Sequence, residues 1–531
     1  MGALISHTQT PVILEPLLSI AGIRMHTFAS PLRHALKNAP EKLAVVSNDR
    51  TFTYAQFNDR CERLACALAD LGVAQGDRVA ILSNNSHEYL ESYVAIPAGG
   101  MVIVPLNTRH AQAELHYALQ DSGAKVLISD RDPSDLGELA TLVDHVVSCG
   151  DDYDTKLAAA TPRPLGEGVT EDDLAGLFYT GGTTGKSKGV MLSHRNLIAN
   201  TQHWMLCAPQ TPDDVFLIIA PLFHAAGSNG VLGSIWTLGT QVTLGAFDPG
   251  TALDLIERYN ATATLGVPTM LAAIAETQAV TPRNVSSMRL IAHGGSPIAT
   301  EVLRRTATAF PSAELMEVYG STETAPLCTV LPGEQHLLDA PLARSCGRPV
   351  IGCDIDICDT AGESLPIGDI GEVVARGPHV MRGYWNKDEQ TRAVLKDNGY
   401  WTGDLGYMDA EGYVFLVDRS KDMIVSGGEN VYCTEVEEVL YQHPAVLEAA
   451  AFGVPDERWG EAVWATVVPR EGNNQLEQRE LIDFCKQQIA GYKVPKGIDF
   501  QNEPLPKSGP GKVLKRELRA PYWEGKDASV N

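Results

Sequence analysis

Residues 179–189 read YTGGTTGKSKG, and this stretch decides how the rest of the chain is interpreted. Its glycines allow positive φ and let backbone N–H groups approach an anion closely. Threonine and serine hydroxyls add hydrogen-bond donors, and Lys186 and Lys188 add positive charge. The combination predicts a loop that wraps around the phosphates of a nucleotide.

Part of this stretch also looks like the end of a P-loop, because glycine, lysine and serine follow one another at 185–187. The P-loop motif G-x-x-x-x-G-K-[ST] needs a glycine five residues before Gly185. Position 180 is a threonine and Gly181 comes one residue too late, so the P-loop interpretation fails on spacing. A plain Gly/Thr surface loop is the other alternative, but such loops seldom carry two lysines between apolar segments.

Further short motifs follow this loop along the chain. They are PLFHAAG at 221–227, AHGGSP at 292–297, EVYGSTET at 317–324, YWTGDLG at 400–406, DRSKDMIVSGGENVY at 418–432 and LPKSGPGK at 505–512. In this order they resemble the signatures of the adenylate-forming superfamily, in its acyl-CoA synthetase and fatty-acid–CoA ligase branch. Aryl-CoA ligases, luciferases and peptide-synthetase adenylation domains belong to the same superfamily.

Hydrophobic periodicity predicts an α/β fold. Apolar residues from Phe57 to Leu71 recur every three or four positions, which is typical of a helix, and Gly72 follows them. The apolar runs at 78–82, 102–106 and 125–129 are typical of buried strands separated by helical segments. Alternating strands and helices predict βαβ units and a largely parallel sheet.

The resemblance implies how this α/β chain is divided. An N-terminal tail is expected at 1–28, an adenylate-forming N-terminal domain at 29–419 and a mobile C-terminal domain at 420–531. The large domain is expected to contain mixed, largely parallel sheets flanked by helices, together with a β-subdomain. The C-terminal domain is expected to be small and α+β.

Composition restricts the class of protein. A chain of 531 residues with 44% hydrophobic residues is long enough for more than one core. The formal net charge of −24 argues against sequence-independent nucleic-acid binding, which needs a basic face. No apolar run is long enough to span a bilayer and the N-terminus does not read as a signal peptide, so we expect a cytoplasmic protein.

The 10 cysteines are scattered and form no C-x-x-C pair. The closest pairs, Cys61 with Cys66 and Cys353 with Cys358, lack neighbouring histidines that could complete a zinc site. We therefore expect reduced thiols in the core.

The resemblance implies an enzyme that activates a carboxylic acid with ATP and Mg²⁺ and then transfers the acyl group to CoA. The first step forms acyl-AMP and pyrophosphate, and the second forms the thioester and AMP. The protein must align the reactants and stabilise the charge around phosphorus, so no nucleophilic side chain is needed. The expected partners are these small molecules, and a homodimer is compatible with the sequence.

The motifs carry over a nucleotide site residue by residue. The loop should hold the β- and γ-phosphates, Glu323 should bind Mg²⁺ together with Thr184, and Tyr319 should stack on adenine. Asp404 should accept hydrogen bonds from the ribose hydroxyls. The expected nucleotide-binding residues are Thr180, Gly181, Gly182, Thr183, Thr184, Gly185, Lys186, Lys188, Gly294, Gly295, Ser296, Tyr319, Gly320, Thr322, Asp404 and Arg419.

The C-terminal motifs imply a second set of roles. Lys512 in SGPGK matches the lysine that delivers positive charge to the carboxylate and the α-phosphate. Lys421 matches the hinge about which the small domain turns between the two steps. The glycine-rich segment then lines the CoA channel, with Gly427, Gly428 and Glu429 as its expected residues.

His224 is expected at the mouth of the acid pocket, with a purely structural histidine as the alternative. Small residues follow it: Ala225, Ala226, Gly227 and Gly230. They predict free volume, which favours a medium- to long-chain fatty acid or another bulky hydrophobic acid over acetate. No tyrosine suited to a phenol follows His224, which disfavours a hydroxycinnamate specialist.

Other functions stay open at this point. An aryl-CoA ligase of the benzoate or cinnamate type, a carrier-protein-loading adenylation enzyme and an oxidative luciferase would share the adenylation step. The chain ends soon after its last motif without a carrier segment, so free CoA is the expected acceptor. A non-catalytic nucleotide sensor is the hypothesis from a different class, and the presence of Lys512 and Glu323 argues against it.

Overall fold

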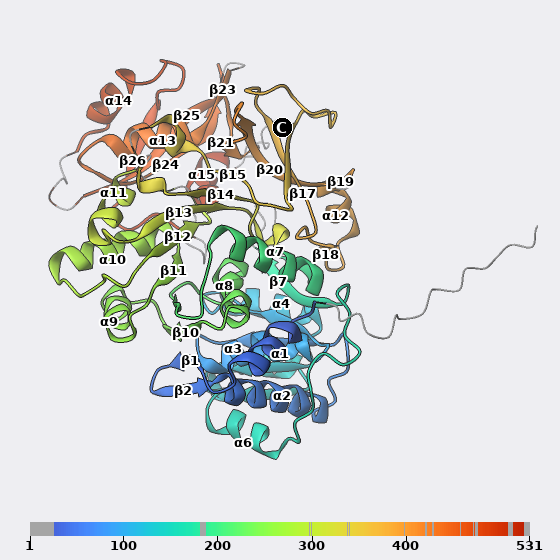
Figure 1. The fold of residues 1–531 in the computed structure, drawn as a ribbon. Coiled ribbons are helices and arrows are strands. Elements are labelled where there is room, and N and C mark those ends of the chain that lie inside the picture. The colour runs from blue at the N-terminus through green and yellow to red at the C-terminus, as the bar shows by residue number, and fades with distance from the viewer. Residues whose placement is uncertain are drawn as a thin grey trace, which may run out of the picture.

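The computed structural model of the protein describes most of the chain (Figure 1). The described residues are 26–180, 187–296, 298, 300–336, 338, 340–397, 399–419, 422–426, 429–456, 458–470, 472, 476–507 and 513–524, not including the side chains of Arg419, Glu429 and Asn430. Strands and helices alternate along most of the chain, so the predicted α/β class is confirmed.

The first sheet orders its strands β15-β14-β13-β12-β11-β9-β10-β1-β2. Neighbours from β1 to β13 in this order pair in parallel, whereas β2, β14 and β15 pair antiparallel at the two edges. The strands are β1 (Leu43–Ser47), β2 (Arg50–Thr53), β9 (Val215–Ile218), β10 (Thr240–Thr243), β11 (Ala263–Gly266), β12 (Leu290–Gly294), β13 (Glu314–Tyr319), β14 (Thr329–Pro332) and β15 (Arg348–Pro349).

The second sheet has the order β18-β8-β7-β4-β3-β5-β6. Its β3, β4 and β5 occupy the three apolar runs predicted as strands, and they pair in parallel. The strands are β3 (Arg78–Leu82), β4 (Val102–Pro105), β5 (Val126–Ser129), β6 (His145–Ser148), β7 (Leu174–Thr180), β8 (Lys188–Ser193) and β18 (Gly383–Tyr384).

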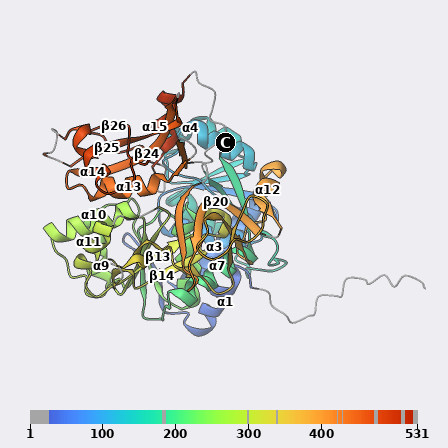
Figure 2. The ribbon, with the colours of Figure 1, turned by 90° about the horizontal axis from the view of Figure 1, so that it is seen from above.

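Two smaller sheets follow. An antiparallel β-subdomain contains β16 (Asp354–Cys358), β17 (Gly371–Arg376), β19 (Leu395–Lys396), β20 (Gly399–Met408) and β21 (Val414–Arg419). The C-terminal sheet contains β22 (Ile424–Ser426), β23 (Glu429–Val431), β24 (Val446–Asp456), β25 (Gly460–Pro469) and β26 (Gly497–Phe500). Figures 1 and 2 both show the red C-terminal elements gathered on one side of the molecule.

Helices cover these sheets. In the N-terminal part they are α1 (Ala29–Asn38), α2 (Tyr54–Asp70), α3 (His87–Ala98), α4 (Gln112–Ser122), α5 (Pro133–Leu136), α6 (Asp151–Ala159), α7 (His194–Cys207), α8 (Ala225–Trp236), α9 (Pro249–Tyr259), α10 (Pro268–Val280), α11 (Thr300–Ala309) and α12 (Asp388–Val394). The C-terminal helices are α13 (Cys433–Gln442), α14 (Gln478–Lys486) and α15 (Lys515–Trp523). Short 3-10 helices are η1 (Gly137–Leu142), η2 (Thr322–Thr324), η3 (Glu334–His336) and η4 (Pro341–Arg344).

Helix α2 shows how local sequence sets these elements. Thr53 and Gln56 form a capping box at its start, and Gly72 with positive φ follows its end. The apolar stripe that predicted this helix is buried, with Phe57 and Leu68 in the core. The polar face of α2 carries Arg60, which reaches other helices.

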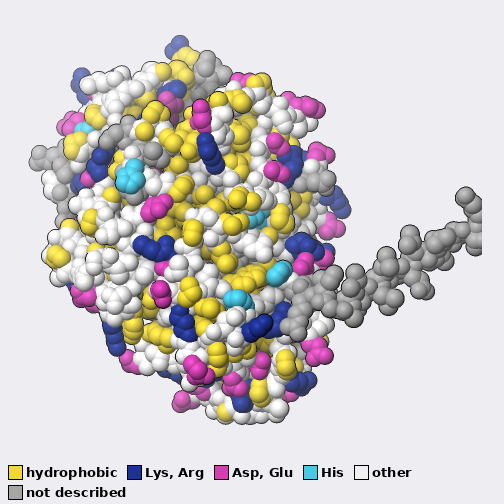
Figure 3. Space-filling view, viewed as in Figure 1, with side chains coloured by type: hydrophobic (Ala, Val, Ile, Leu, Met, Phe, Trp, Pro, Cys, Tyr) yellow, Lys and Arg dark blue, Asp and Glu magenta, His cyan; other side chains and the backbone are white. Residues whose placement is uncertain are grey.

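The charges on the surface are mixed rather than segregated. Figure 3 shows lysine, arginine, aspartate and glutamate scattered over one face among apolar side chains. Within the described ranges, no helix combines the length and the apolar character needed to cross a bilayer.

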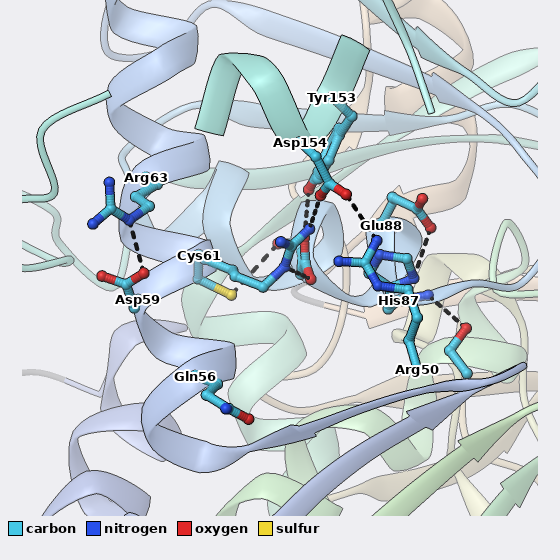
Figure 4. A network of polar contacts seen from close by, with 12 residues as sticks. Arg50, Gln56, Asp59, Cys61, Arg63, His87, Glu88, Tyr153 and Asp154 are labelled. Carbon is cyan, nitrogen blue, oxygen red and sulfur yellow. Dashed lines mark hydrogen bonds and ion pairs between the residues drawn. The ribbon is translucent and has the colours of Figure 1, made fainter. Parts of the chain in front are cut away.

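A buried ion-pair network joins α2, α3 and α6. The Arg60 guanidinium donates to Glu91 Oε1 at 2.6 Å and to Asp154 Oδ1 at 2.7 Å, and the Tyr153 hydroxyl donates to Glu91 Oε2 at 2.9 Å. Glu91 is fully buried. Figure 4 shows Tyr153 and Asp154 in this network, with the pair of Arg63 and Asp59 standing apart on α2.

Arg60→Ala is expected to lower the free energy of unfolding by about 3–5 kcal/mol, because it leaves the buried Glu91 carboxylate uncompensated. Arg63→Ala is the matched control. Arg63 is part-exposed, pairs with Asp59 one turn away on the same helix and donates to the Ala160 carbonyl, so its loss leaves no buried charge unpaired and should cost about 1–2 kcal/mol. Urea denaturation of both variants measures the difference, and equal destabilisation would contradict the role of the network.

Candidate functional site

The β7–β8 hairpin carries the stretch predicted to bind phosphates. Thr180 ends β7 and pairs across the antiparallel ladder with Lys188, the first residue of β8. The expected phosphate-binding residues between them lie outside the described part of the chain: Gly181, Gly182, Thr183, Thr184, Gly185 and Lys186. The ladder therefore fixes where the loop leaves and rejoins the sheet.

The end of this loop is connected to the expected magnesium ligand through Tyr384. The ammonium group of Lys188 lies 4.0 Å from the centre of the Tyr384 ring. The Tyr384 hydroxyl donates a hydrogen bond of 2.8 Å to Glu323 Oε1. Tyr384 lies on β18, which pairs with β8, so strand pairing brings these residues together although 61 positions separate Tyr384 from Glu323. Sequence reasoning missed Tyr384 because no motif or local spacing connects it with Glu323.

Glu323 has the properties of a ligand for a hard cation. Glu323 is only 9% exposed. Among the described residues, only Tyr384 forms a hydrogen bond with its carboxylate. Burial, with the nearby Glu323 charge, raises the pKa of Tyr384, so its hydroxyl stays a donor. A carboxylate held through one oxygen, with the other available, fits Mg²⁺.

Two parallel strands end where adenine is expected. Gly294 ends β12 and pairs with Val318, next to Tyr319 at the end of β13. Gly295 and Ser296 continue from β12, and Gly320 continues from β13. These chain segments therefore lie side by side at the carboxyl edge of the sheet.

Gly320 shows why a glycine is needed at this edge. A Cβ atom built at Gly320 would lie 1.8 Å from the carbonyl oxygen of Pro326, which no side chain can tolerate. The chain then enters η2, which contains Thr322 and Glu323. The close backbone approach at Gly320 therefore sets the position of the expected metal ligand.

Tyr319 and Asp404 meet across the site. The Tyr319 hydroxyl donates to Asp404 Oδ2 at 2.8 Å, although 85 positions separate the two residues. In the antiparallel pairing of β20 and β21, Asp404 lies opposite Arg419, whose side chain is outside the described part. Burial, and then the charge of Asp404, raises the pKa of Tyr319. The expected adenine and ribose residues thus form one surface.

A buried acidic cluster lies beneath the adenine edge. His293, the residue before Gly294, is 2.5 Å from Glu334 through Nε2 and Oε2, and both side chains are buried. Glu317 lies opposite His293 in the parallel pairing of β12 and β13. Burial raises the pKa of Glu317, the charge of His293 opposes this and the charge of Glu334 adds to it, so that the pKa is about 7.

This cluster predicts a pH-dependent stability. In the unfolded chain Glu317 ionises near its ordinary pKa of 4.5, whereas in the fold it keeps its proton to about 7. Between about pH 4.5 and 7 the folded state binds more protons than the unfolded state, so the free energy of unfolding should fall as the pH rises through this range. Glu317→Gln should have the same Tm as the wild type near pH 5 and a higher Tm than the wild type near pH 8. Glu314→Gln, exposed on the same strand, is the control, and an unchanged Tm difference across this range would contradict the assignment.

A cavity of about 300 Å³ opens beside the adenine edge. Its lining is mainly apolar and includes Phe247, Leu265, Val267, Met270 and Leu327. His224, which precedes α8, also lines this cavity, and its place at the mouth of an acid pocket stays a prediction. Burying apolar surface there would favour a hydrophobic acid.

The small residues after His224 do not provide the expected free volume. A Cβ atom at Gly227 would lie 2.0 Å from the carbonyl oxygen of Pro221, and one at Gly230 would lie 2.6 Å from the Phe216 ring. These glycines let α8 pack closely against neighbouring chain. The interpretation that they lengthen the pocket is therefore wrong for Gly227 and Gly230.

Asn229 adds a polar group that sequence reasoning missed. It lines the cavity from α8 and is only 7% exposed. An amide carries donors and an acceptor, so this residue can bind a polar group of a ligand. An asparagine on a helix gives no sequence signal of its own.

The C-terminal predictions fall largely outside the described residues. Lys421, Gly427, Gly428 and Lys512 all lie there. Glu429 is described only in its backbone, which begins β23 and pairs with Ser426. The hinge, the CoA channel and the catalytic lysine therefore stay predictions.

Comparison with known families gives two matches. The model of the family described as AMP-binding enzyme matches residues 32–385, and the model described as AMP-binding enzyme C-terminal domain matches residues 435–512. The first match contains the phosphate loop and Tyr384, and the second contains the final SGPGK motif.

Similar proteins support the same grouping. A feruloyl-CoA synthase of Amycolatopsis sp is 40% identical over 491 residues, which cover 92% of this chain and 97% of the relative. A fatty acid–[acyl-carrier-protein] ligase, ScoC of Streptomyces coeruleorubidus, is 35% identical over 96% of this chain and 99% of its own length. The crystal structure of ATP-bound MatB from Rhodopseudomonas palustris superimposes with a TM-score of 0.84 at 32% identity, covering 93% of this chain and 99% of MatB.

Proposed function

This chain belongs to the AMP-binding enzymes and is an AMP-forming acid–CoA ligase, and from this premise we propose that its acid is a compact aromatic acid of the arylpropenoic class. ATP, Mg²⁺ and CoA are its co-substrates and cofactor. A carboxylate oxygen attacks the α-phosphorus, and the bond to pyrophosphate breaks. The CoA sulfur then attacks the acyl carbon, AMP leaves, and the thiol proton passes to solvent.

We assign the adenylation machinery to the site described above. Tyr319 and the glycine edge hold adenine, while Asp404 holds the ribose. Glu323, together with Thr184, would hold Mg²⁺, which when bound neutralises charge on the phosphate oxygens. Tyr384 orients the Glu323 carboxylate and contacts Lys188, the first residue of β8. The observed contacts and the family motifs together support these roles.

The size of the cavity supports a compact acid. A volume of about 300 Å³ is at the lower end of what small-molecule sites offer, and part of this space lies beside the adenine edge at Gly294 and Gly295. Gly227 and Pro221 line the cavity, and a side chain at Gly227 or Gly230 would collide with Pro221 or Phe216, so these glycines add no length to it. A long alkyl chain would need more room than a single substituted ring.

The chemistry of the lining supports a ring with a polar substituent. Phe247 and Met270 offer apolar contact to an aromatic face, and the Asn229 amide offers a donor and an acceptor to one polar group. Asn229 takes the role that a tyrosine would play in binding a phenol. The placement of Asn229 on the lining of a compact, mainly apolar cavity is the observation that carries this proposal, and the 40% identical feruloyl-CoA synthase agrees with it.

CoA-dependent AMP release should be measured with ferulate, 4-hydroxycinnamate, cinnamate, benzoate, decanoate and palmitate. We expect the highest kcat/KM for a ring-hydroxylated arylpropenoate. A higher kcat/KM for decanoate or palmitate would contradict the proposal and favour the fatty acid predicted from the sequence. A homodimer and a cytoplasmic location also stay predictions.

Asn229→Leu tests the residue that distinguishes these acids. The variant should lower kcat/KM for 4-hydroxycinnamate by about tenfold, because one substrate hydrogen bond is lost, and should change cinnamate by less than about twofold. Ser228→Ala is the matched control, since the Ser228 hydroxyl bonds to the Ala225 carbonyl within the same helix. Equal losses for both acids would assign Asn229 a packing role instead.

A further inference from the structure

Three residues that are far apart in the sequence form a buried cluster behind the nucleotide site. The Sγ atoms of Cys328 and Cys353 and one ring nitrogen of His379 all lie within 4.8 Å of one another. Cys328 and His379 are fully buried and Cys353 is 4% exposed. Both cysteines are free thiols. Such a set of two sulfur ligands and one nitrogen ligand is typical of zinc sites.

The spacing of these atoms agrees with a tetrahedral ion. With zinc–sulfur bonds of about 2.3 Å and zinc–nitrogen bonds of about 2.0 Å, ligand sulfur and nitrogen atoms lie about 3.6 Å apart. The Cys328 Sγ and the His379 Nε2 are 3.7 Å apart. This pair therefore already has the separation that a shared zinc ion would give.

A second histidine packs against the cluster. The ring of His203, from α7, packs edge-on against that of His379 with centroids 5.0 Å apart. A Cβ atom at Gly352 would lie 3.0 Å from the His203 Nε2, so the absence of a side chain at Gly352 leaves room for this ring beside Cys353. The His379 Nε2 faces Cys328, and the Nδ1 atoms of both rings are buried without a hydrogen-bond partner among the described residues.

The backbone around the cluster is held firmly. The Asn196 amide, on α7, donates to the carbonyl oxygens of Pro378 and Val380 at 2.8 Å each, on either side of His379. The Cys353 N–H donates to the Val350 carbonyl, and the Val350 N–H donates to the Cys328 carbonyl. These hydrogen bonds hold the cluster in place where α7, β14 and the β-subdomain meet.

We propose that Cys328, Cys353 and His379 bind one Zn²⁺ ion, with the His203 ring packed against the ring of His379. Both thiols lose their protons to solvent when the metal binds. The ion joins three segments that converge behind the nucleotide site. One segment includes Pro326 and Leu327, which line the acid cavity, and another includes Met381, whose N–H donates to the Glu323 carbonyl at 2.8 Å. The role of the ion is structural and separate from that of Mg²⁺.

The metal content of the full-length protein tests this proposal. Protein purified without chelator and without a metal-affinity step should contain about one zinc per chain by elemental mass spectrometry. Protein stripped of metal and kept reduced should bind Co²⁺ with a thiolate-to-cobalt charge-transfer band and the visible bands of a tetrahedral ion. These measurements on the wild type do not depend on any variant folding.

Variants identify the ligands. Cys328→Ser and His379→Gln should lower bound zinc to below about a tenth per chain, with circular dichroism confirming that the protein is folded. Cys358→Ser is the matched control, because Cys358 is also buried and near in sequence to Cys353 but is not in the cluster. It should keep the zinc of the wild type.

Two results would overturn the proposal. One is a reduced wild-type protein that holds no zinc and gives no charge-transfer band with Co²⁺. The other is a denatured mass lower by two hydrogens and restored by reductant, which would show a disulfide between Cys328 and Cys353 instead.

Discussion

Lys512→Ala is expected to lower the rate of acyl-AMP formation by about 100- to 1000-fold and to leave thioester formation from supplied acyl-AMP within about threefold of the wild type. The physical reason is that negative charge accumulates where the carboxylate oxygen meets the α-phosphorus. A lysine on the SGPGK loop can neutralise that charge in the first step and withdraw before the second. Lys512 lies outside the described residues, so this prediction depends on the motif and the family.

The two half-reactions must be measured separately. Pyrophosphate exchange into ATP in the presence of the acid reports the first step, and CoA consumption with synthetic acyl-AMP reports the second. Lys507→Ala is the matched control on the same segment, because Lys507 already pairs with Glu448 at 2.6 Å. Both half-reactions should persist in this control. Equal loss of the two steps in Lys512→Ala would remove the proposed role.

Glu323→Gln should have the second-largest effect, a loss of about 100- to 1000-fold in adenylation at ordinary Mg²⁺ concentrations. The substitution keeps the size of the side chain and an acceptor for Tyr384, but it removes the negative charge that a divalent cation requires. Raising the Mg²⁺ concentration should recover part of the activity. The measurement is the initial rate of pyrophosphate release as a function of Mg²⁺.

Tyr384→Phe separates orientation from charge. It removes the hydrogen bond to Glu323 but keeps the carboxylate and the ring beneath Lys188, so the expected loss is about tenfold or less. If Glu323→Gln and Tyr384→Phe had the same activity, the charge of Glu323 would not be needed to bind the metal. Full activity of Glu323→Gln at low Mg²⁺ would contradict the assignment more directly.

The strands, the helices and the reaction class could be predicted because their signals are contiguous. The apolar run at 78–82 became β3 and the stripe from Phe57 to Leu68 became the buried face of α2. Side chains repeat on one face of a strand or a helix within a few residues, so the chain records these elements locally. The motifs of the nucleotide site are equally short, and the family matches agree with them.

The shape of the acid pocket could not be predicted in this way. The sequence predicted free volume at Gly227 and Gly230, but neighbouring atoms occupy the space where their side chains would be. Asn229 gave no signal, because only the position of α8 against the cavity makes its amide important. Whether a small residue opens a cavity depends on what packs against it.

The sequence by itself determined the α/β class and the adenylate-forming family, and it predicted the segments that bind ATP. Only the tertiary structure decided which distant side chains share a site: Tyr384 with Glu323 across 61 positions, and Cys328 with His379 across 51. Local spacing argued against a zinc site, because it compared each cysteine only with its neighbours along the chain. Strand pairing and the packing of α7 bring these residues together, and such contacts depend on the whole fold rather than on any short stretch of it.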